Sequence, residues 1–379
     1  MRMDKPLRLL DGLKPSEFLR DYWQKKPLLI RAALPDFTGL LDPSELAGLA
    51  CEDEVQARII QHKNKKWSVK NGPFDDSDFA RLSKKDWTLL VQSVNQHLPE
   101  AADLLAQFNF IPHARLDDLM VSYAPDGGGV GAHFDSYDVF LLQGSGKRRW
   151  KISAQKDLSL VENAPIKILQ NFEAEQEWVL EAGDMLYLPP HIAHLGTAEG
   201  DDCMTYSIGF RAPKTQELIH EFLNYLQDNI AVEGLYEDAD LTLQQHPAEI
   251  NENMLKKVGE MLQKITWDKN NVVDFLGKYL TEPKPDLVFA PARKISKADF
   301  TNKLAQKSLH LNLKSQMLFH ADNFYLNGEK LGVPSTIITE IREFSDTKTL
   351  NTPALSAKIH AALCDVLYDA YLSGFINFN

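Results

Sequence analysis

Residues 127–150 read GGGVGAHFDSYDVFLLQGSGKRRW, and their spacing decides how the centre of the chain folds. Residues two apart in a strand point to the same side, so His133 and Asp135 can present an imidazole and a carboxylate to one ion. Phe134 then faces the opposite side. His-x-Asp alone is a weak signal, because a solvated loop or a capping contact produces the same spacing. The stretch predicts a strand that carries two ligands of a metal site.

A third ligand candidate lies in GDMLYLPPHIAHLG, from Gly183 to Gly196. This stretch resembles the second conserved motif of cupin barrels, and in that register His194 falls on the ligand position. His191 occupies the turn position that usually holds a small residue, so it stays a competing ligand. Two histidines and one carboxylate form the facial arrangement that binds Fe(II) and leaves other coordination positions open. The alternative is that both histidines only line a polar loop.

An arginine stands where the alternation calls for an apolar side chain. After the turn at Gly144–Gly146, the strand KRRWKI places Arg148 on the same face as Trp150 and Ile152, which is the inward face. A buried guanidinium without an anion is strongly unfavourable, so Arg148 should hold a carboxylate through a two-pronged contact. That carboxylate belongs either to an internal Asp or Glu or, as we favour, to 2-oxoglutarate, whose other end would chelate the metal.

The overall composition is that of a soluble globular protein with more than one domain. The chain has 379 residues, of which 44% are hydrophobic and 25% charged, enough for two or three cores. Its net charge of −12 argues against broad nucleic-acid binding and fits a basic protein as partner. Three widely spaced cysteines suggest neither disulfides nor a thiolate zinc site. Because no apolar run reaches about 18 residues, we expect no membrane association and a cytoplasmic location.

The hydrophobic patterns divide the chain into three predicted domains. Residues 1–213 combine helical segments, among them SDFARLSKKDWTLLVQSVNQHL, with closely spaced short strands, which favours an antiparallel barrel or sandwich. Residues 214–270 contain two amphipathic helices that cannot bury their apolar faces alone, so we expect a helical dimerisation region and a homodimer. Residues 271–379 combine helices with a hairpin, which suggests a winged-helix-like domain. Their acidic and basic residues nearly balance, which favours protein contact over DNA binding.

These motifs resemble those of the JmjC-type cupin oxygenases, and more narrowly those of the bacterial ribosomal oxygenases. The resemblance covers essentially the whole chain, and its most specific part is RLDDLMVSYAPDGGGVGAHFDSYDVFLLQGSGKRRW, followed by LYLPPHIAHLG and YSIGFRAP. It implies an α+β chain with a double-stranded β-helix (a cupin or JmjC jelly roll), N-terminal helices, a helical dimerisation region and a C-terminal winged helix.

The resemblance also implies a site and an activity. Fe(II) would bind His133, Asp135 and His194, and the cosubstrate 2-oxoglutarate would bind Arg148, with molecular oxygen as the second cosubstrate. The activity would be that of a 2-oxoglutarate-dependent dioxygenase that 3-hydroxylates an arginine side chain of a basic ribosomal protein, large ribosomal subunit protein sixteen.

Further polar residues are candidates for contacts with the cosubstrate or the substrate. Thr205 and Ser207 share one strand face, and we expect the Ser207 hydroxyl to help position 2-oxoglutarate. An ordinary half-polar barrel strand is the alternative. A guanidinium substrate needs an acidic or aromatic receiver near the metal, for which Asp118, Tyr137 and Asp138 are candidates. Each of these three is more often a structural polar residue than a substrate contact.

Two other classes of function stay open. The first is a nucleic-acid-binding regulator that uses the C-terminal module, with the barrel as a ligand sensor. The second is a metal-binding cupin without redox chemistry, in which Arg148 would be paired internally. Within the oxygenases, a histone-type demethylase would differ only in which carbon meets the metal.

Overall fold

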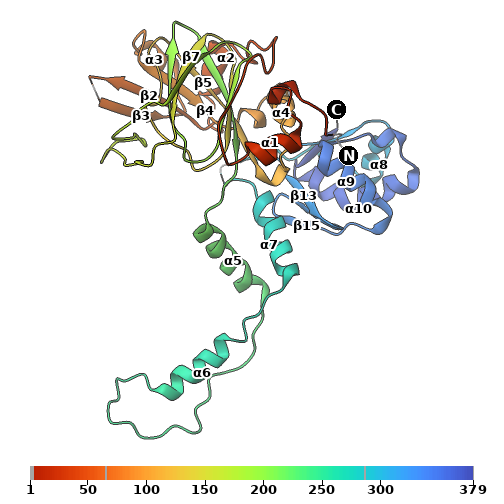
Figure 1. Cartoon of the computed structure of the whole chain (residues 1–379). Helices are drawn as coiled ribbons and strands as arrows, with labels where there is room; N and C mark the ends of the chain where they lie inside the picture. The colour runs from red at the N-terminus through yellow and green to blue at the C-terminus, as the bar shows by residue number, and fades with distance from the viewer. Residues whose placement is uncertain (1–3, 65, 286, 379) are drawn as a thin grey trace. The chain divides into compact units, whose positions relative to one another are not determined.

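The structure, a computed structural model, describes residues 4–64, 66–285 and 287–378, and the chain divides into two compact units (Figure 1). Unit 1 holds the described residues of ranges 1–212 and 285–288, and unit 2 holds those of ranges 213–284 and 289–379. Unit 1 is a two-sheet β-structure with N-terminal helices, and unit 2 combines helices with two small sheets. This architecture agrees with the α+β fold that the sequence predicts.

The described part of unit 1 forms two antiparallel sheets. Their strands are β1 (Leu28–Ile30), β2 (Ala57–Lys63), β3 (Lys66–Asn71), β4 (Trp87–Val91), β5 (Leu116–Ala124), β6 (Val139–Gln143), β7 (Lys147–Ser153), β8 (Gln176–Leu180), β9 (Met185–Leu188), β10 (Ala193–Glu199) and β11 (Cys203–Phe210). The larger sheet has the order β1-β9-β6-β11-β5-β4-β2-β3, and the smaller sheet has the order β10-β7-β8. Several neighbours in space, such as β9 with β1 and β11 with β5, are therefore distant in sequence, as in a jelly roll.

Apolar side chains cover both faces of the larger sheet. One face packs with the smaller sheet around a cluster that includes Leu141, Trp150, Leu180 and Leu186. The other face packs against a larger hydrophobic cluster, to which the N-terminal segments contribute side chains. The helices of this unit are α1 (Pro15–Asp21), α2 (Pro43–Leu49), α3 (Asp76–Ala80) and α4 (Pro99–Ala106), with short 3-10 helices η1 (Arg8–Leu10), η2 (Val94–Gln96) and η3 (His113–Arg115). Central strands are thus buried on both sides, which explains why β6 and β9 are continuous apolar runs.

Two local predictions from the sequence are wrong. The segment expected to be helical between residues 77 and 98 contains the end of α3, then strand β4 and the 3-10 helix η2. Four of the five β4 residues are buried, so the strand lacks the alternation that would distinguish it from a buried helix. The predicted strand around His133 and Asp135 is reduced to an isolated bridge at His133, and Asp135 lies in irregular chain.

Unit 2 contains the predicted helices and hairpin. Its helices are α5 (Thr215–Asn229), α6 (Glu252–Leu262), α7 (Lys269–Thr281), α8 (Lys297–Leu304), α9 (Ile338–Thr347) and α10 (Ala357–Leu372), with 3-10 helices η4 (Ser335–Ile337) and η5 (Thr352–Ala354). Its strands are β12 (Leu309–Leu311), β13 (Met317–His320), β14 (Asn323–Leu326), β15 (Glu329–Leu331), β16 (Thr349–Leu350) and β17 (Ile376–Phe378). They form the sheets β16-β12-β17 and β13-β14-β15. Helices α8 and α10 pack on this core through Phe300, Leu363 and Leu367.

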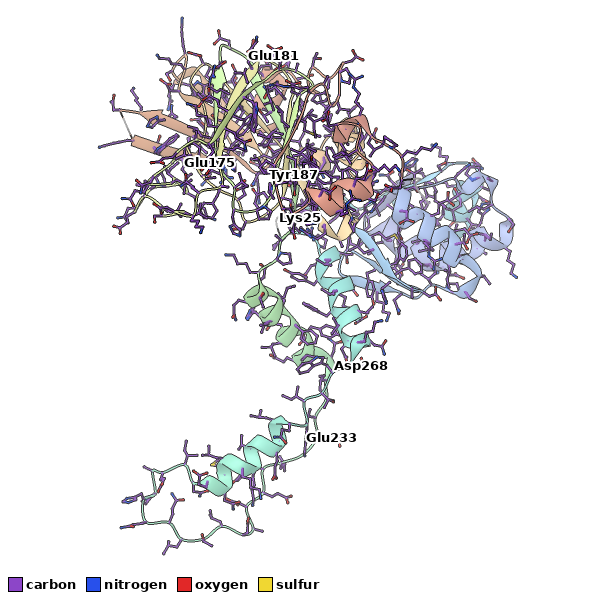
Figure 2. All side chains as sticks on the ribbon, viewed as in Figure 1. Lys25, Glu175, Glu181, Tyr187, Glu233 and Asp268 are labelled. Carbon is purple, nitrogen blue, oxygen red and sulfur yellow. The ribbon has the colours of Figure 1, made fainter. Side chains whose placement is uncertain are left out.

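The segment that carries α6 leaves its apolar residues uncovered within the chain. Figure 2 draws the side chains of this segment, which lies between Glu233 and Asp268. Leu255 is 53% exposed and Leu262 61% exposed, although both lie on the apolar side of α6. No helix in the described part of the chain has the length and apolarity needed to span a bilayer.

Candidate metal centre

A pair of backbone hydrogen bonds places His133 next to His194. The two residues form an antiparallel bridge in which His133 N donates to His194 O (2.9 Å) and His194 N donates to His133 O (2.8 Å). His194 is the second residue of β10 and pairs with Ile152 of β7, and its side chain is only 3% exposed. The ring centroids of the two histidines are 4.2 Å apart. The bridge thus joins the two histidine motifs of the sequence.

Backbone carbonyls orient both imidazole rings. The Nδ1 atom of His133 lies 2.9 Å from the carbonyl oxygen of Gly131, and that of His194 lies 2.9 Å from the carbonyl oxygen of Ile192. A carbonyl only accepts hydrogen bonds, so each ring carries its proton on Nδ1. Each Nε2 then keeps a free lone pair, which is the arrangement that histidine metal ligands require.

Asp135 completes a group of three possible ligand atoms. One such atom from each of His133, Asp135 and His194 lies within 4.8 Å of the others, and Asp135 Oδ2 is 3.7 Å from His194 Nε2. Burial, followed by repulsion from His133, lowers the pKa of His194 and keeps its ring neutral near pH 7. Two imidazole nitrogens and one carboxylate oxygen are a donor set that suits Fe(II) and leaves positions open for other ligands.

His191 lies outside this group of three. Its side chain is exposed and its ring centroid is 6.0 Å from that of Phe134. Its backbone adopts φ +66°, and its N–H donates to Asp135 O at 2.8 Å. A left-handed φ is typical of the small residue that the cupin motif has at this turn. The backbone of His191 therefore helps to hold the loop that carries Asp135, and its side chain takes no part in this contact.

Close contacts with two side chains explain why residue 131, before His133, is a glycine. A Cβ on Gly131 would lie 2.4 Å from Ile168 Cδ1 and 2.9 Å from Trp67 Cζ2, and its φ is +80°. Trp67, on β3, stacks on His62 of β2 at 4.2 Å. The sequence analysis missed Trp67 and Ile168, because nothing in their local pattern signals a contact with a distant loop. They restrict the peptide whose carbonyl orients His133.

Arg148 lies in the space between the two sheets with most of its donors unused. The residue is only 4% exposed, and its Nε and Nη2 atoms have no hydrogen-bond partner in the described part of the chain. Its guanidinium carbon lies 5.8 Å from the ring centroid of Trp150, on the same strand face. The next residue, Arg149, points to the opposite face and pairs with Glu177 and Glu199. A buried, unpaired guanidinium fits a carboxylate ligand that enters this space.

The remaining candidates divide into buried and accessible residues. Thr205 and Ser207 are buried on β11, and Thr205 Oγ1 donates to Gln143 Oε1 at 3.0 Å. Ser207 pairs in register with Leu141 of β6 and therefore lies on the inner face of the larger sheet. Tyr137 is 41% exposed.

Two aspartates of this region have structural partners. Asp118 accepts hydrogen bonds from the backbone N–H and the hydroxyl of Ser93 (2.9 and 3.3 Å). Asp138 is fully buried and accepts hydrogen bonds from the Tyr187 hydroxyl (2.6 Å) and from Gln24 Nε2 (3.0 Å). Asp138 is thus a structural polar residue, which is the alternative to a substrate contact given in the sequence analysis.

A jelly roll with a two-histidine, one-carboxylate cluster and a buried unpaired arginine defines the class of the JmjC oxygenases. The comparisons with known families agree. A family model described as a JmjC domain matches residues 103–218, and a model described as a ROXA-like winged helix matches residues 264–377.

Comparison with known relatives identifies the family within the JmjC oxygenases. Over 367 residues the chain is 35% identical to the ribosomal protein uL16 3-hydroxylase of Escherichia coli, and the alignment covers 95% of each chain. It is 42% identical over 239 residues to a probable ribosomal oxygenase of Haemophilus influenzae, covering 62% of this chain and 57% of that one. The structure of YcfD, a ribosomal oxygenase from Escherichia coli, in complex with cobalt and 2-oxoglutarate matches with a TM-score of 0.82 at 32% identity, covering 96% of this chain and 98% of that one. The chain therefore belongs to the family of JmjC-domain ribosomal oxygenases.

Proposed function

We propose that this protein is an Fe(II)- and 2-oxoglutarate-dependent hydroxylase that acts on an arginine side chain of ribosomal protein uL16, the large ribosomal subunit protein sixteen. The observation that carries the proposal is the unpaired, buried Arg148 in the same space between the sheets as the inward-facing His194. The relative in Escherichia coli is named a uL16 3-hydroxylase, which supports the substrate and the carbon.

The proposed ligands follow from the geometry described above. His133, Asp135 and His194 would hold the metal on one face, because their donor atoms already cluster within 4.8 Å. Arg148 would hold the distal carboxylate of 2-oxoglutarate through Nε and Nη2, with the Ser207 hydroxyl beside it. When bound, Fe(II) would activate molecular oxygen, the oxidant: one oxygen atom would go to the substrate and the other to 2-oxoglutarate, which would be oxidised to succinate and carbon dioxide.

The protein contributes orientation and exclusion of water. The carbonyls of Gly131 and Ile192 fix the histidine tautomers before the metal arrives. Apolar side chains between the sheets, such as Trp150 and Leu186, surround the cosubstrate position with a low-dielectric wall.

A basic substrate is supported by the acidic residues near the metal. Tyr137 is accessible, and desolvation together with the carboxylates of Asp135 and Asp118 raises the pKa of its hydroxyl. The hydroxyl therefore stays protonated and can donate a hydrogen bond to a substrate, while the carboxylates attract a guanidinium. We propose Tyr137 and Asp118 as substrate contacts. The net charge of −12 adds long-range attraction for a basic ribosomal protein.

The assembly and location extend the proposal. We propose a homodimer that covers the apolar sides of α5 and α6, and a three-part division into residues 1–213, 214–270 and 271–379. The last part would serve protein contact. Because the proposed substrate is a ribosomal protein, we also propose that the enzyme acts in the cytoplasm.

A direct assay tests the proposed function. The purified chain is incubated with Fe(II), 2-oxoglutarate, oxygen and a uL16 peptide, and both succinate release and a mass gain of one oxygen atom on an arginine are measured. Asp135→Ala and His194→Ala should abolish both signals. A cupin without redox chemistry would give metal binding with no oxygen-dependent succinate, and that result would contradict the proposal.

A further inference from the structure

A second pocket lies in unit 2, beside the N-terminal end of α8. It is an open depression with a volume of about 790 Å³, which is within the size range of small-molecule sites. Three cationic side chains line it, Arg293, Lys294 and Lys303, together with a single acidic one, Asp299. In a chain with a net charge of −12, such a local excess of positive charge is not the composition of an average surface region.

The three cations have no acidic partner within the described residues. No ion pair joins Arg293, Lys294 or Lys303 to a described carboxylate. Asp299 instead accepts a hydrogen bond from the Ser296 hydroxyl at 2.7 Å, as part of the cap of α8. Five other cations of the unit pair with described acids, namely Lys278 and Lys330 with Asp274, Lys257 with Asp240, Lys297 with Asp365, and Arg342 with Asp322, whereas Lys256 and Lys307 do not.

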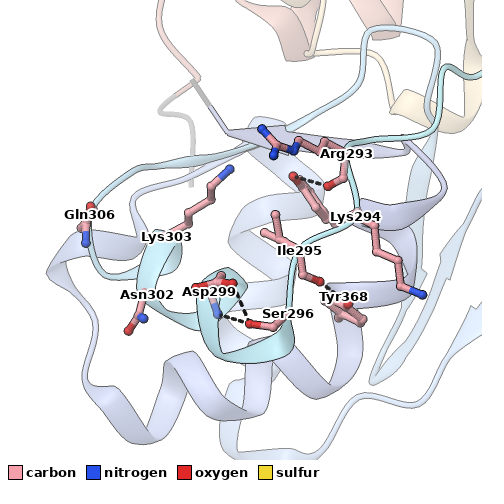
Figure 3. Close-up of a pocket in the computed structure, with 10 residues that line it drawn as sticks. Arg293, Lys294, Ile295, Ser296, Asp299, Asn302, Lys303, Gln306 and Tyr368 are labelled. Atoms are coloured by element: carbon pink, nitrogen blue, oxygen red, sulfur yellow. Dashed lines mark hydrogen bonds between the residues drawn. The ribbon is translucent and has the colours of Figure 1, made fainter.

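Arg293 and Lys303 are the two cations whose side chains extend toward the pocket. Figure 3 shows the side chains of Arg293 and Lys303 directed toward the same end of the pocket, whereas Lys294 points away. The Lys303 ammonium lies 5.9 Å from the ring centroid of Tyr371 and 5.7 Å from that of Phe378, so aromatic faces support it. An anion bound in the pocket would be attracted by both cations. The arrangement therefore favours a bound anion.

The pocket wall is held in place by tyrosines of α10. The Tyr368 hydroxyl donates to the carbonyl oxygen of Ile295, and the Tyr371 hydroxyl donates to that of Arg293. These bonds tie the irregular segment that carries Arg293 to the helix core, so the guanidinium starts from a fixed backbone. Binding then costs less ordering entropy than at a free surface loop.

We propose that this pocket binds a phosphate-bearing ligand. A phosphate group offers several acceptor oxygens and close to two negative charges, which match a guanidinium and an ammonium together. Asn302 and Gln306 add amide donors along the same wall. A single carboxylate has too few acceptor sites for this set of donors. The ligand is either a free phosphorylated molecule, such as a nucleoside polyphosphate, or a phosphodiester segment of RNA.

Calorimetry on the full chain tests the proposal, with pyrophosphate, ATP and a short single-stranded RNA as probes and a polyglutamate peptide as the non-phosphate anion. We expect binding that weakens with salt and becomes about 10- to 100-fold weaker in Lys303→Gln and Arg293→Gln. Asn302→Asp, which adds a negative charge on the exposed face of α8, should weaken it as well. Lys307→Gln removes the same charge just outside the pocket and should leave binding unchanged.

The outcomes separate the sources of phosphate. Binding of pyrophosphate and ATP assigns the pocket to a free phosphorylated molecule, and binding of RNA alone assigns it to a phosphodiester backbone. The proposal is overturned if no phosphate probe binds, if polyglutamate binds as tightly, or if Lys307→Gln weakens binding as much as Lys303→Gln. Hydroxylase activity is measured separately, so failure of this pocket does not depend on the metal centre.

Discussion

Arg148 and Arg149 are neighbours on β7, yet their guanidinium groups lie in opposite environments. Arg149 is on the outer face, where Glu177 and Glu199 neutralise it. Arg148 is buried between the sheets, and its Nε and Nη2 have no partner in the described structure. Because the alternation of a strand alone decides which of the two points inward, the pair provides a test site and its matched control on adjacent residues.

Removal of the inward guanidinium should separate cosubstrate binding from stability. We expect Arg148→Met to raise the KM for 2-oxoglutarate about 100-fold or more, since two charge-assisted hydrogen bonds are lost. Without cosubstrate, the same change should stabilise the protein by about 1–3 kcal/mol, because a buried unpaired charge is replaced by an apolar side chain. Succinate production and thermal unfolding in the absence of 2-oxoglutarate measure the two effects.

Arg149→Met is the control for this experiment. It removes the same charge from the outer face, where ion pairs contribute little, so both the KM and the stability should change only slightly. A variant of Arg148 that keeps its affinity for 2-oxoglutarate would show that the cosubstrate is held elsewhere.

The two histidines of the PPHIAH segment should behave differently. His194→Gln removes a donor atom of the cluster, so we expect metal affinity to fall by at least about tenfold. His191→Gly should keep metal affinity and activity, because only its backbone contacts Asp135, and glycine accepts φ +66° without strain. Titration with Co(II), followed by absorption spectroscopy, compares the two variants directly. Loss of metal from His191→Gly with retention in His194→Gln would reverse the assignment.

Much of the metal centre is predictable because its signals are local. The side of the strand on which Arg148 lies follows from alternation within a few residues, and His133, Asp135 and His194 occur in short motifs with a known register. The sequence pattern predicts a helix where the structure has strand β4, because this strand is buried on both faces and shows no period of two. Local sequence patterns therefore identify residues whose role depends on their spacing within one short motif, such as the three ligand candidates and Arg148.

Contacts between distant segments were not predictable in the same way. The order of the larger sheet brings β9 beside β1 and β6. The sequence pattern of a strand does not indicate which other strands it pairs with. The contact of Trp67 with the loop at Gly131 joins a hairpin to a segment far along the chain. Such contacts depend on the complete topology, which single-sequence periodicity does not contain.

Gly131 offers a test of how the loop supports the metal. Gly131→Ala introduces a Cβ at 2.4 Å from Ile168 Cδ1 and at a left-handed φ. The displaced peptide should misplace the carbonyl that orients His133, and we expect metal affinity to fall about 10- to 100-fold. Calorimetric titration with Co(II) measures the loss.

Two further variants determine the cause of that loss. Ile168→Ala combined with Gly131→Ala should recover part of the affinity, because the closest clash is relieved while the contact with Trp67 and the backbone strain stay. Gly48→Ala, in α2 with open space at its Cβ, should stabilise the protein by about 0.5–1 kcal/mol and leave metal binding unchanged. Full affinity in Gly131→Ala would show that the carbonyl of Gly131 does not control the His133 ring.

The apolar side of α6 gives a prediction about assembly. Leu255 and Leu262 are more than half exposed within one chain, so a second copy of the chain that covers them would bury substantial apolar surface. We expect the unaltered protein to sediment as a dimer and the double variant Leu255→Gln/Leu262→Gln to sediment largely as a monomer. Lys256→Gln changes an exposed polar residue between them and should leave the dimer intact. A monomeric unaltered protein, or a dimer that survives the double change, would assign the face to another partner, since exposed leucines at helical spacing require some cover in water.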